Sequence, residues 1–247
     1  MGALAGKYIS ILGASTSTFE GYSNGTHYNS TIGGNAVYYP KEFLSDVDDT
    51  WWMKAIRALD LKLCINNSWS GSCVTIKVDG EQKAGCMARA TALHNDQLNI
   101  DPDIIILIIG GNDALRGYEI GDYHGANDIY DPQANAYIGD CTLFGHAYAT
   151  MLHKVKSRYK GADVYTCSML HWQPKKHDKG LLAYNNVIKK IATELGATYV
   201  DFYNGTNISP ETASLYLHTD GVHPTARGFA EMSNCLVKLL QSKYENA

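Results

Sequence analysis

Short apolar runs alternate along the chain with longer segments in which apolar residues recur at helical spacing. The runs predict strands over residues 8–12, 61–65, 103–109, 164–170 and 198–202. The central run, 103–109, holds five isoleucines and a leucine. Because these runs are continuously apolar rather than alternating, both faces of each strand are expected to be covered, as in a parallel sheet.

Helices are expected in the segments between and after these strands. Asp49 or Thr50 can cap a first helix that runs from Trp51 to Leu59. Further helices are expected over about 84–98, 144–159, 182–195 and 229–240. Strand–helix alternation of this kind predicts an α/β sandwich with right-handed crossovers.

Two stretches do not follow the alternation, residues 20–40 and 116–140, which are rich in glycine and tyrosine. Both are longer than most loops of a compact domain, and such loops tend to be functional or mobile. Because no internal repeat or linker interrupts the pattern, residues 1–247 are predicted to form a single domain.

The composition and charge of the chain argue against some classes of binding partner. Hydrophobic residues make up 45% of the chain and charged residues 19%, which is ordinary for a soluble globular protein. The net charge of −4 and the lack of long Lys/Arg runs argue against binding to nucleic acid or to an anionic membrane. No apolar stretch approaches the roughly 20 residues that span a bilayer.

The first six residues are too short and too uncharged for a secretion signal. Composition does not separate a cytoplasmic chain from a secreted chain whose signal has been removed. The six cysteines are residues 64, 73, 86, 141, 167 and 235. None has zinc-like spacing, so no metal site is predicted, and a disulfide between Cys73 and Cys86 is left open.

Two motifs at opposite ends of the chain carry the groups for nucleophilic catalysis. The first expected strand runs into Gly13-Ala14-Ser15, and a serine hydroxyl becomes a useful nucleophile only beside a base. Near the C-terminus, Asp220 lies three residues before His223 and can fix the tautomer of the imidazole. Each motif alone also fits a non-catalytic role, which is a helix cap for the serine and a surface turn for the histidine.

Two other strand ends offer hydrogen-bond donors. Gly71 follows the second expected strand, and a glycine lets a backbone N–H approach a ligand closely. Asn112 follows the central strand in the run 110–113, Gly-Gly-Asn-Asp. Donors of this kind stabilise the oxyanion of acyl transfer by about 2.7–4 kcal/mol each. A turn glycine and an Asn-Asp strand cap are the alternatives for the two motifs taken singly.

The order of these four motifs resembles that of the SGNH hydrolases, also called GDSL esterases. The resemblance implies that Ser15 is the nucleophile, with His223 as its base and Asp220 orienting the base. It also implies an oxyanion hole of the Ser15 and Gly71 N–H groups and the Asn112 amide. The implied fold is a three-layer α/β/α sandwich with a central, mainly parallel five-stranded sheet. The implied reaction is two-step acyl transfer without a cofactor.

One residue departs from the family pattern, because this chain has Ala14 where an aspartate is usual. Loss of that carboxylate is expected to weaken the hydrogen bonds of the nucleophile turn. It also supports a competing hypothesis, a non-catalytic ligand-binding protein on the same fold. A flavodoxin-like nucleotide or flavin binder is a third hypothesis, but the chain lacks its glycine-rich phosphate-binding patterns. The other histidines are expected to be structural or exposed: 27, 94, 124, 146, 153, 171, 177 and 218.

The resemblance extends to many acetylesterases of carbohydrates, which implies a short acyl group on a small-molecule or oligosaccharide ester. Aromatic side chains that can face sugar rings are predicted substrate contacts: Tyr22, Trp51, Trp52 and Trp69. The alternative for Trp51 and Trp52 is that they bury a helix against the sheet. Lipase-like, aryl esterase and thioesterase activities remain open for the same catalytic groups.

Overall fold

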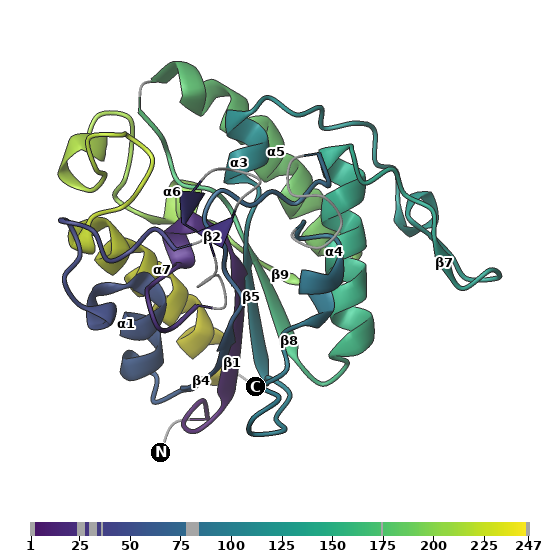
Figure 1. Ribbon diagram of the computed structural model, residues 1–247, viewed down its shortest axis with the longest axis horizontal. Helices are drawn as coiled ribbons and strands as arrows, with labels where there is room; N and C mark the ends of the chain where they lie inside the picture. Colours follow the sequence, from purple (N-terminus) through teal and green to yellow (C-terminus); the bar gives the residue numbers. More distant parts are fainter. Residues whose placement is uncertain are drawn as a thin grey trace.

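A parallel five-stranded sheet lies at the centre of the computed structural model (Figure 1). The structure describes residues 3–23, 28–29, 34–35, 37–77, 84–173 and 175–245. The strand order is β4-β1-β5-β8-β9, and every neighbouring pair is parallel. The strands are β1 (Tyr8–Gly13), β4 (Lys62–Asn66), β5 (Ile104–Ile108), β8 (Asp163–Cys167) and β9 (Thr198–Val200). All five predicted strands are confirmed, although the fourth ends at Cys167 and not at residue 170.

The α-helices are α1 (Trp51–Ala58), α3 (Gly111–Leu115), α4 (Phe144–Arg158), α5 (Lys175–Glu194), α6 (Phe202–Gly205) and α7 (Ala226–Glu245). Short 3-10 helices are η1 (Ser15–Ser17), η2 (Val47–Asp49), η3 (Ala88–Thr91), η4 (Ala126–Asp128) and η5 (Ala213–Leu215). Two small antiparallel pairs join β2 (Tyr28–Asn29) to β3 (Gly34–Asn35) and β6 (Tyr130–Asp131) to β7 (Ala136–Tyr137). The second pair projects from the body of the molecule in Figure 1.

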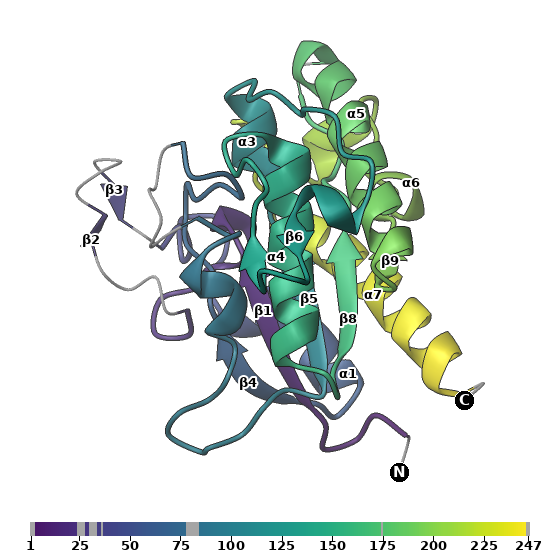
Figure 2. The same ribbon diagram turned by 90° about the vertical axis from the view of Figure 1, so that its right-hand side faces the viewer.

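Helices cover both faces of the sheet: α1 and α7 lie on one side and α4 and α5 on the other in Figure 1, and α4 lies in front of the strands in Figure 2. Along β5, Ile104, Ile106 and Ile108 pack in one cluster with side chains of α1 and α7. Ile105 and Leu107 pack in the other cluster with side chains of α4 and α5. No side chain of β5 is more than 8% exposed. The continuous apolar run is therefore explained by burial on both faces, and the three-layer sandwich is confirmed.

The start of α1 is set by a side-chain cap. Thr50 is the N-cap residue, and its Oγ1 accepts a hydrogen bond from the Met53 N–H at 3.2 Å. Such caps contribute about 1 kcal/mol to helix stability. The helix packs Trp51, Trp52 and Ile56 into the same cluster as α7. The first predicted helix is therefore confirmed, and it brings an early part of the chain against the last helix.

The predicted helix over 84–98 is wrong. This stretch forms only the 3-10 helix η3, joined to turns, because its carbonyl groups bond to other parts of the fold. The Thr91 carbonyl accepts from the Tyr159 hydroxyl, and the Leu93 carbonyl accepts from the Ser10 hydroxyl. Helix spacing of apolar residues was misleading here, because tertiary hydrogen bonds replaced the helical ones.

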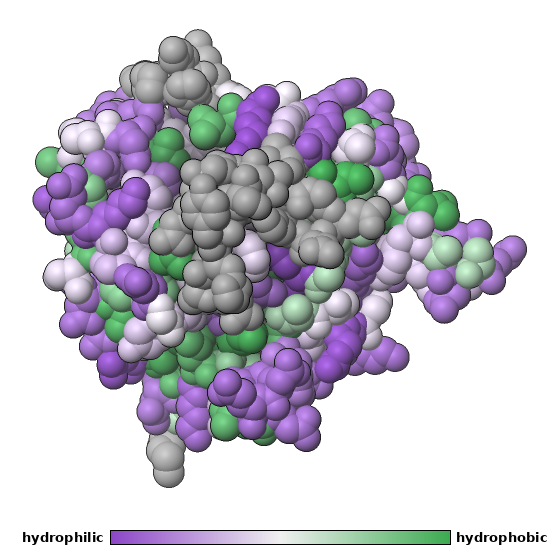
Figure 3. All heavy atoms as spheres, viewed as in Figure 1, coloured by the Kyte–Doolittle hydropathy of each residue, from purple (hydrophilic) through white to green (hydrophobic). Residues whose placement is uncertain are grey.

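Hydrophilic side chains dominate the face seen in Figure 3, with hydrophobic residues in small groups between them. Among the residues that the structure describes, no helix is both long enough and apolar enough to cross a bilayer.

Candidate active site

The nucleophile segment lies directly beyond the carboxyl end of β1. The strand ends at Gly13, and Ser15 opens η1. A Cβ at Gly13 would lie 2.7 Å from the Ser17 hydroxyl, so only glycine fits this close turn. The Ser15 N–H stands in the first turn of η1, where backbone N–H groups lack an intrahelical acceptor. The turn therefore presents both the hydroxyl and the N–H of Ser15 at the edge of the sheet.

Ala14 makes no side-chain capping bond to η1. The turn is held instead by other groups, since Trp51 Nε1 donates to the Thr16 carbonyl at 3.1 Å. Asn66 Nδ2 also donates to the Ser17 carbonyl at 2.8 Å. The turn thus keeps its shape through indole and amide donors, although the aspartate usual at position 14 is absent.

Ser15, His223 and Asp220 form a continuous hydrogen-bonded chain. His223 Nε2 lies 2.7 Å from Ser15 Oγ, across a separation of 208 residues. His223 Nδ1 lies 2.7 Å from Asp220 Oδ2. The structure therefore brings together the three residues that the two distant motifs suggested, in the order needed to move a proton from the hydroxyl to the imidazole.

The Asp220 carboxylate is held in its charged form. Burial raises its pKa, but the N–H groups of His223 and Val222 donate to Oδ1 at 3.0 and 2.9 Å. These bonds and the imidazole outweigh burial and lower the pKa of Asp220 to about 2. An ionised carboxylate beside Nδ1 favours the tautomer whose proton sits on Nδ1, which leaves Nε2 free to accept.

His223 is kept neutral by its surroundings. Burial lowers its pKa and outweighs the raising effect of Asp220, while Lys41 and His218 lower it further. A neutral imidazole can accept the Ser15 proton, whereas an imidazolium cannot. The balance of burial and charge around His223 therefore suits a general base.

Gly71 and Asn112 lie at the ends of the two strands that flank β1. Gly71 has a φ of 77°, which glycine adopts without strain, and its carbonyl accepts from Arg116 at 3.2 Å. Asn112 Nδ2 donates to the Ser72 carbonyl at 2.9 Å. An amide nitrogen carries two hydrogens, so a second one remains for a ligand. The Asn112–Ser72 bond ties this amide to the segment that carries Gly71.

Asp113 was not assigned a role from the sequence, and it is fully buried beside this segment. It accepts hydrogen bonds from the Val74 N–H and from both the N–H and the hydroxyl of Thr75, at 2.9–3.0 Å. Burial raises the pKa of Asp113 to about 6 against these donors. The side chain fixes the 72–75 segment to the start of α3, and with it the relative position of Gly71 and Asn112.

A cavity of about 360 Å³ begins at Ser15 and His223 and extends along the carboxyl edge of the sheet. Its size falls within the usual range of small-molecule sites, about 300–1,000 Å³. Most of its walls are apolar, and they include Leu115, Met169, Trp172, Val222 and Met232. The arrangement can hold an apolar group next to the hydroxyl and the imidazole.

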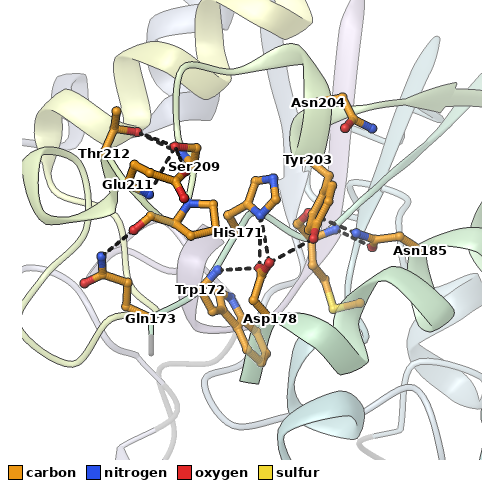
Figure 4. A network of polar contacts seen from close by, with 12 residues as sticks. His171, Trp172, Gln173, Asp178, Asn185, Tyr203, Asn204, Ser209, Glu211 and Thr212 are labelled. Carbon is orange, nitrogen blue, oxygen red and sulfur yellow. Dashed lines mark hydrogen bonds and ion pairs between the residues drawn. The ribbon is translucent and has the colours of Figure 1, made fainter. Parts of the chain in front are cut away.

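One wall of this cavity, the segment 168–173, is anchored by a buried polar network (Figure 4). Asp178 on α5 accepts from the Trp172 N–H at 3.0 Å and contacts His171 Nδ1 at 3.0 Å. The Tyr203 hydroxyl donates to the same carboxylate at 2.9 Å. This network holds Trp172 against the cavity. His171 is bonded within this network, and its structural role stays a prediction.

Two of the predicted substrate contacts require correction. Trp51 and Trp52 have no exposed surface and lie in the core between α1, α7 and the sheet. The structure supports the alternative, that they bury a helix against the sheet. Trp51 also supports the nucleophile turn through its hydrogen bond to the Thr16 carbonyl. Tyr22 is 44% exposed and Trp69 is half-buried, but neither lines the cavity. Their contact with substrate stays a prediction.

The sequence also missed two aromatic residues of the site. Tyr38 stacks on the imidazole of His223, and its hydroxyl donates to Asp220. His218, expected to be structural or exposed, lies with its Nδ1 3.7 Å from Asp220 Oδ2. Tyr38 falls in the long stretch 20–40, which does not follow the strand–helix alternation. No spacing rule selects it from the neighbouring tyrosines.

No disulfide joins Cys73 and Cys86, so the pairing left open by the sequence does not form in the structure. Cys64 and Cys167 are buried, while Cys235 is half-buried. Across the described ranges, no group of three or more His, Cys, Asp or Glu side chains could hold a metal ion.

A family model described as GDSL-like lipase/acylhydrolase matches residues 7–239. A structure of a protein described as a GDSL-like lipase from Bacteroides ovatus is 23% identical, with a TM-score of 0.69 over 96% of this chain and 99% of the other. Another from Bacteroides uniformis is 22% identical, with a TM-score of 0.70 over 96% of each chain.

An acetylxylan esterase from Geobacillus stearothermophilus is 16% identical, with a TM-score of 0.55 over 96% of this chain and 95% of the other. At these identities the likeness to solved structures shows a shared fold. No curated protein matches the sequence.

Proposed function

This chain belongs to the family of GDSL-like lipases and acylhydrolases and is a carboxylic ester hydrolase, and from that premise we propose the residues that carry the reaction. Ser15 is the nucleophile, His223 the general base and Asp220 the carboxylate that orients the base. The observation that carries this proposal is the 2.7 Å contact between Ser15 Oγ and His223 Nε2.

The reaction proceeds in two acyl-transfer steps. His223 Nε2 takes the proton of Ser15 as Oγ attacks the ester carbonyl carbon, and the carbonyl electrons move to its oxygen. The Ser15 and Gly71 N–H groups and the Asn112 amide stabilise that oxyanion. The intermediate collapses, and the alcohol leaves with the proton from His223. Water then repeats the sequence on the acyl-enzyme and releases the acid.

Replacing the nucleophile tests the proposal. Ser15→Ala removes the only atom that forms the acyl-enzyme, so hydrolysis of p-nitrophenyl acetate should fall by at least about a thousandfold. Ser157→Ala, an exposed serine on α4, is the matched control and should keep full activity. Equal slow release by wild type and Ser15→Ala would instead favour the non-catalytic ligand-binding protein suggested by Ala14.

For the alcohol part of the ester, we propose a carbohydrate, as the family resemblance predicts. A second, more polar groove of about 340 Å³ is lined in part by Tyr38, Glu20, Lys41 and Ser70. Carboxylate, ammonium and hydroxyl groups suit the hydroxyl groups of a sugar. The groove therefore supports a hydroxyl-rich leaving group, and the sequence predicts acetyl as the acyl group on it.

The apolar cavity favours a second candidate for the acyl group, a chain longer than acetyl. An acetyl methyl would leave most of the 360 Å³ unfilled. Each further methylene buried against Leu115, Met169 and Trp172 contributes about 0.8 kcal/mol, or about fourfold in kcat/KM. This reading corresponds to the lipase-like alternative that the sequence left open.

A series of p-nitrophenyl esters from acetate to octanoate, beside acetylated and butyrylated oligosaccharides, separates the two candidates. If the cavity binds the acyl chain, kcat/KM rises with chain length until the cavity is full. Leu115→Asp should abolish that rise while keeping acetate hydrolysis, because it places a charge on the apolar wall. Leu182→Asp, at a similarly exposed leucine of α5 away from the cavity, is the control. Highest activity on acetyl esters would favour the acetylesterase.

A further inference from the structure

Tyr38 makes two contacts with the proposed catalytic groups. Its ring stacks on the imidazole of His223, with centroids 3.8 Å apart and an interplanar angle of 11°. Its hydroxyl donates to Asp220 Oδ2 at 3.0 Å. The same oxygen lies 2.7 Å from His223 Nδ1, so one carboxylate oxygen serves both the tyrosine and the histidine.

The backbone around Tyr38 is anchored on both sides. The Tyr38 N–H donates to Thr18 Oγ1 at 2.8 Å, close to the nucleophile turn. The next residue, Tyr39, is 1% exposed, and its hydroxyl donates to the Pro224 carbonyl at 2.8 Å. The Tyr39 ring packs edge-on against Phe229 of α7. Tyr38 and Tyr39 therefore both bind the turn that carries His223. Tyr38 contacts Asp220 before the histidine, and Tyr39 contacts Pro224 after it.

We propose that Tyr38 is a positioning residue for acyl transfer, whose hydroxyl orients the Asp220 carboxylate and whose ring shields one face of the His223 imidazole from water. The inference rests on the proposed function, since it assigns His223 as the base. It assigns Tyr38 no contact with the reacting atoms, so its effect is exerted through Asp220 and His223.

Groups from three segments face the imidazole. They are Asp220 and His218 from its own loop, Tyr38 and Lys41 from the 37–41 segment, and Ser15 from η1. Asp220 Oδ2 shares its negative charge between two donors, which weakens its stabilisation of an imidazolium. Lys41 Nζ lies 4.1 Å from the centroid of the Tyr38 ring, and its charge also opposes protonation of His223. Both effects keep His223 in its basic form.

The test compares the pH dependence of kcat/KM in wild type and Tyr38→Phe. The phenylalanine keeps the stacked ring and removes the bond to Asp220, so kcat should fall by about two- to tenfold with KM little changed. The midpoint of the acid limb should move to higher pH, because Asp220 Oδ2 then serves His223 alone. Tyr38→Leu also removes the ring that holds Lys41 and shields the imidazole, so its acid limb should lie higher still.

Tyr137→Phe, which removes from the projecting β6–β7 pair a tyrosine hydroxyl that contacts His153 Nδ1, is the control and should match wild type. A Tyr38→Phe enzyme with wild-type kcat and an unmoved acid limb would overturn the inference, and this variant answers the question even if Tyr38→Leu fails to fold. A fall in kcat with an unmoved limb would also overturn it, as the sign of a merely structural role. Ser15→Ala distinguishes failure of the proposed function from failure of this inference. If Ser15→Ala still hydrolyses the ester at the wild-type rate, the proposed function is wrong, whatever Tyr38→Phe shows.

Discussion

Asp113 and Asp220 show how the surroundings of one side-chain type decide its charge. Asp113 is fully buried, and burial raises its pKa to about 6. Asp220 lies at the surface of the site, where backbone donors and His223 overcome burial and lower its pKa to about 2. Asp220 is therefore ionised in the range in which His223 titrates, and under the proposed function the imidazole sets the acid limb of activity.

The direction of the His223 shift gives a prediction for that limb. Burial lowers the pKa of His223 below its ordinary value of 6.5. The base must be neutral to act, so activity should persist at pH 6.5 and fall only as the pH drops through the lowered pKa. A profile of kcat/KM for p-nitrophenyl acetate, corrected for spontaneous hydrolysis, measures the midpoint. A midpoint at or above 6.5 would mean that the imidazole is more solvated, or more strongly stabilised by Asp220, than the structure indicates.

At the scale of elements, the turn before α7 depends on one close backbone approach. Gly221 has a φ of 72°, and a Cβ there would lie 2.3 Å from the Gln173 carbonyl oxygen. The Gln173 N–H donates to the Gly221 carbonyl at 2.9 Å. The segment that lines the cavity is thus in direct contact with the turn that carries Asp220 and His223.

Gly221→Ala should damage both stability and activity. The left-handed conformation costs a non-glycine residue about 1–2 kcal/mol, and the methyl group forces the two backbones apart. Displacement of His223 by about 1 Å can reduce the rate by about a hundredfold. Thermal unfolding and kcat measure the two effects. Gly161→Ala, where a Cβ meets nothing within 4 Å, is the control, and equal behaviour of the two variants would refute the argument.

Elements differed in how well the sequence predicted them. The strand β5 and the helix α1 were predictable because local signals agree with the fold, a buried isoleucine run in one and the Thr50 cap in the other. The helix expected over 84–98 was not, because the hydrogen bonds of Thr91 and Leu93 go to residues distant in the chain. Tyr38 was missed for the same reason, since its proposed role rests on contacts with residues about 180 positions away in the chain.

At the scale of the whole molecule, the three-layer fold was predictable from the alternation of buried strands and helices, and the convergence of Ser15 with His223 from the resemblance of the motif order to a known hydrolase family. The cavity was not, because its walls come from the ends of several elements. Ala14, Leu115, Met169 and Met232 line one space but share no sequence pattern. Substrate preference is therefore a property of tertiary packing, while the order of the motifs predicts only the class of reaction.

The hydroxyl and the imidazole are 208 residues apart, and they meet only when the first strand and the turn before the last helix have both docked on the same sheet. Under the proposed function, a chain still emerging from the ribosome cannot cleave esters until residue 223 has been added and has reached its place. The time at which ester cleavage begins during refolding therefore reports when the native topology is complete. An assay that follows product release would time that final assembly without any added label.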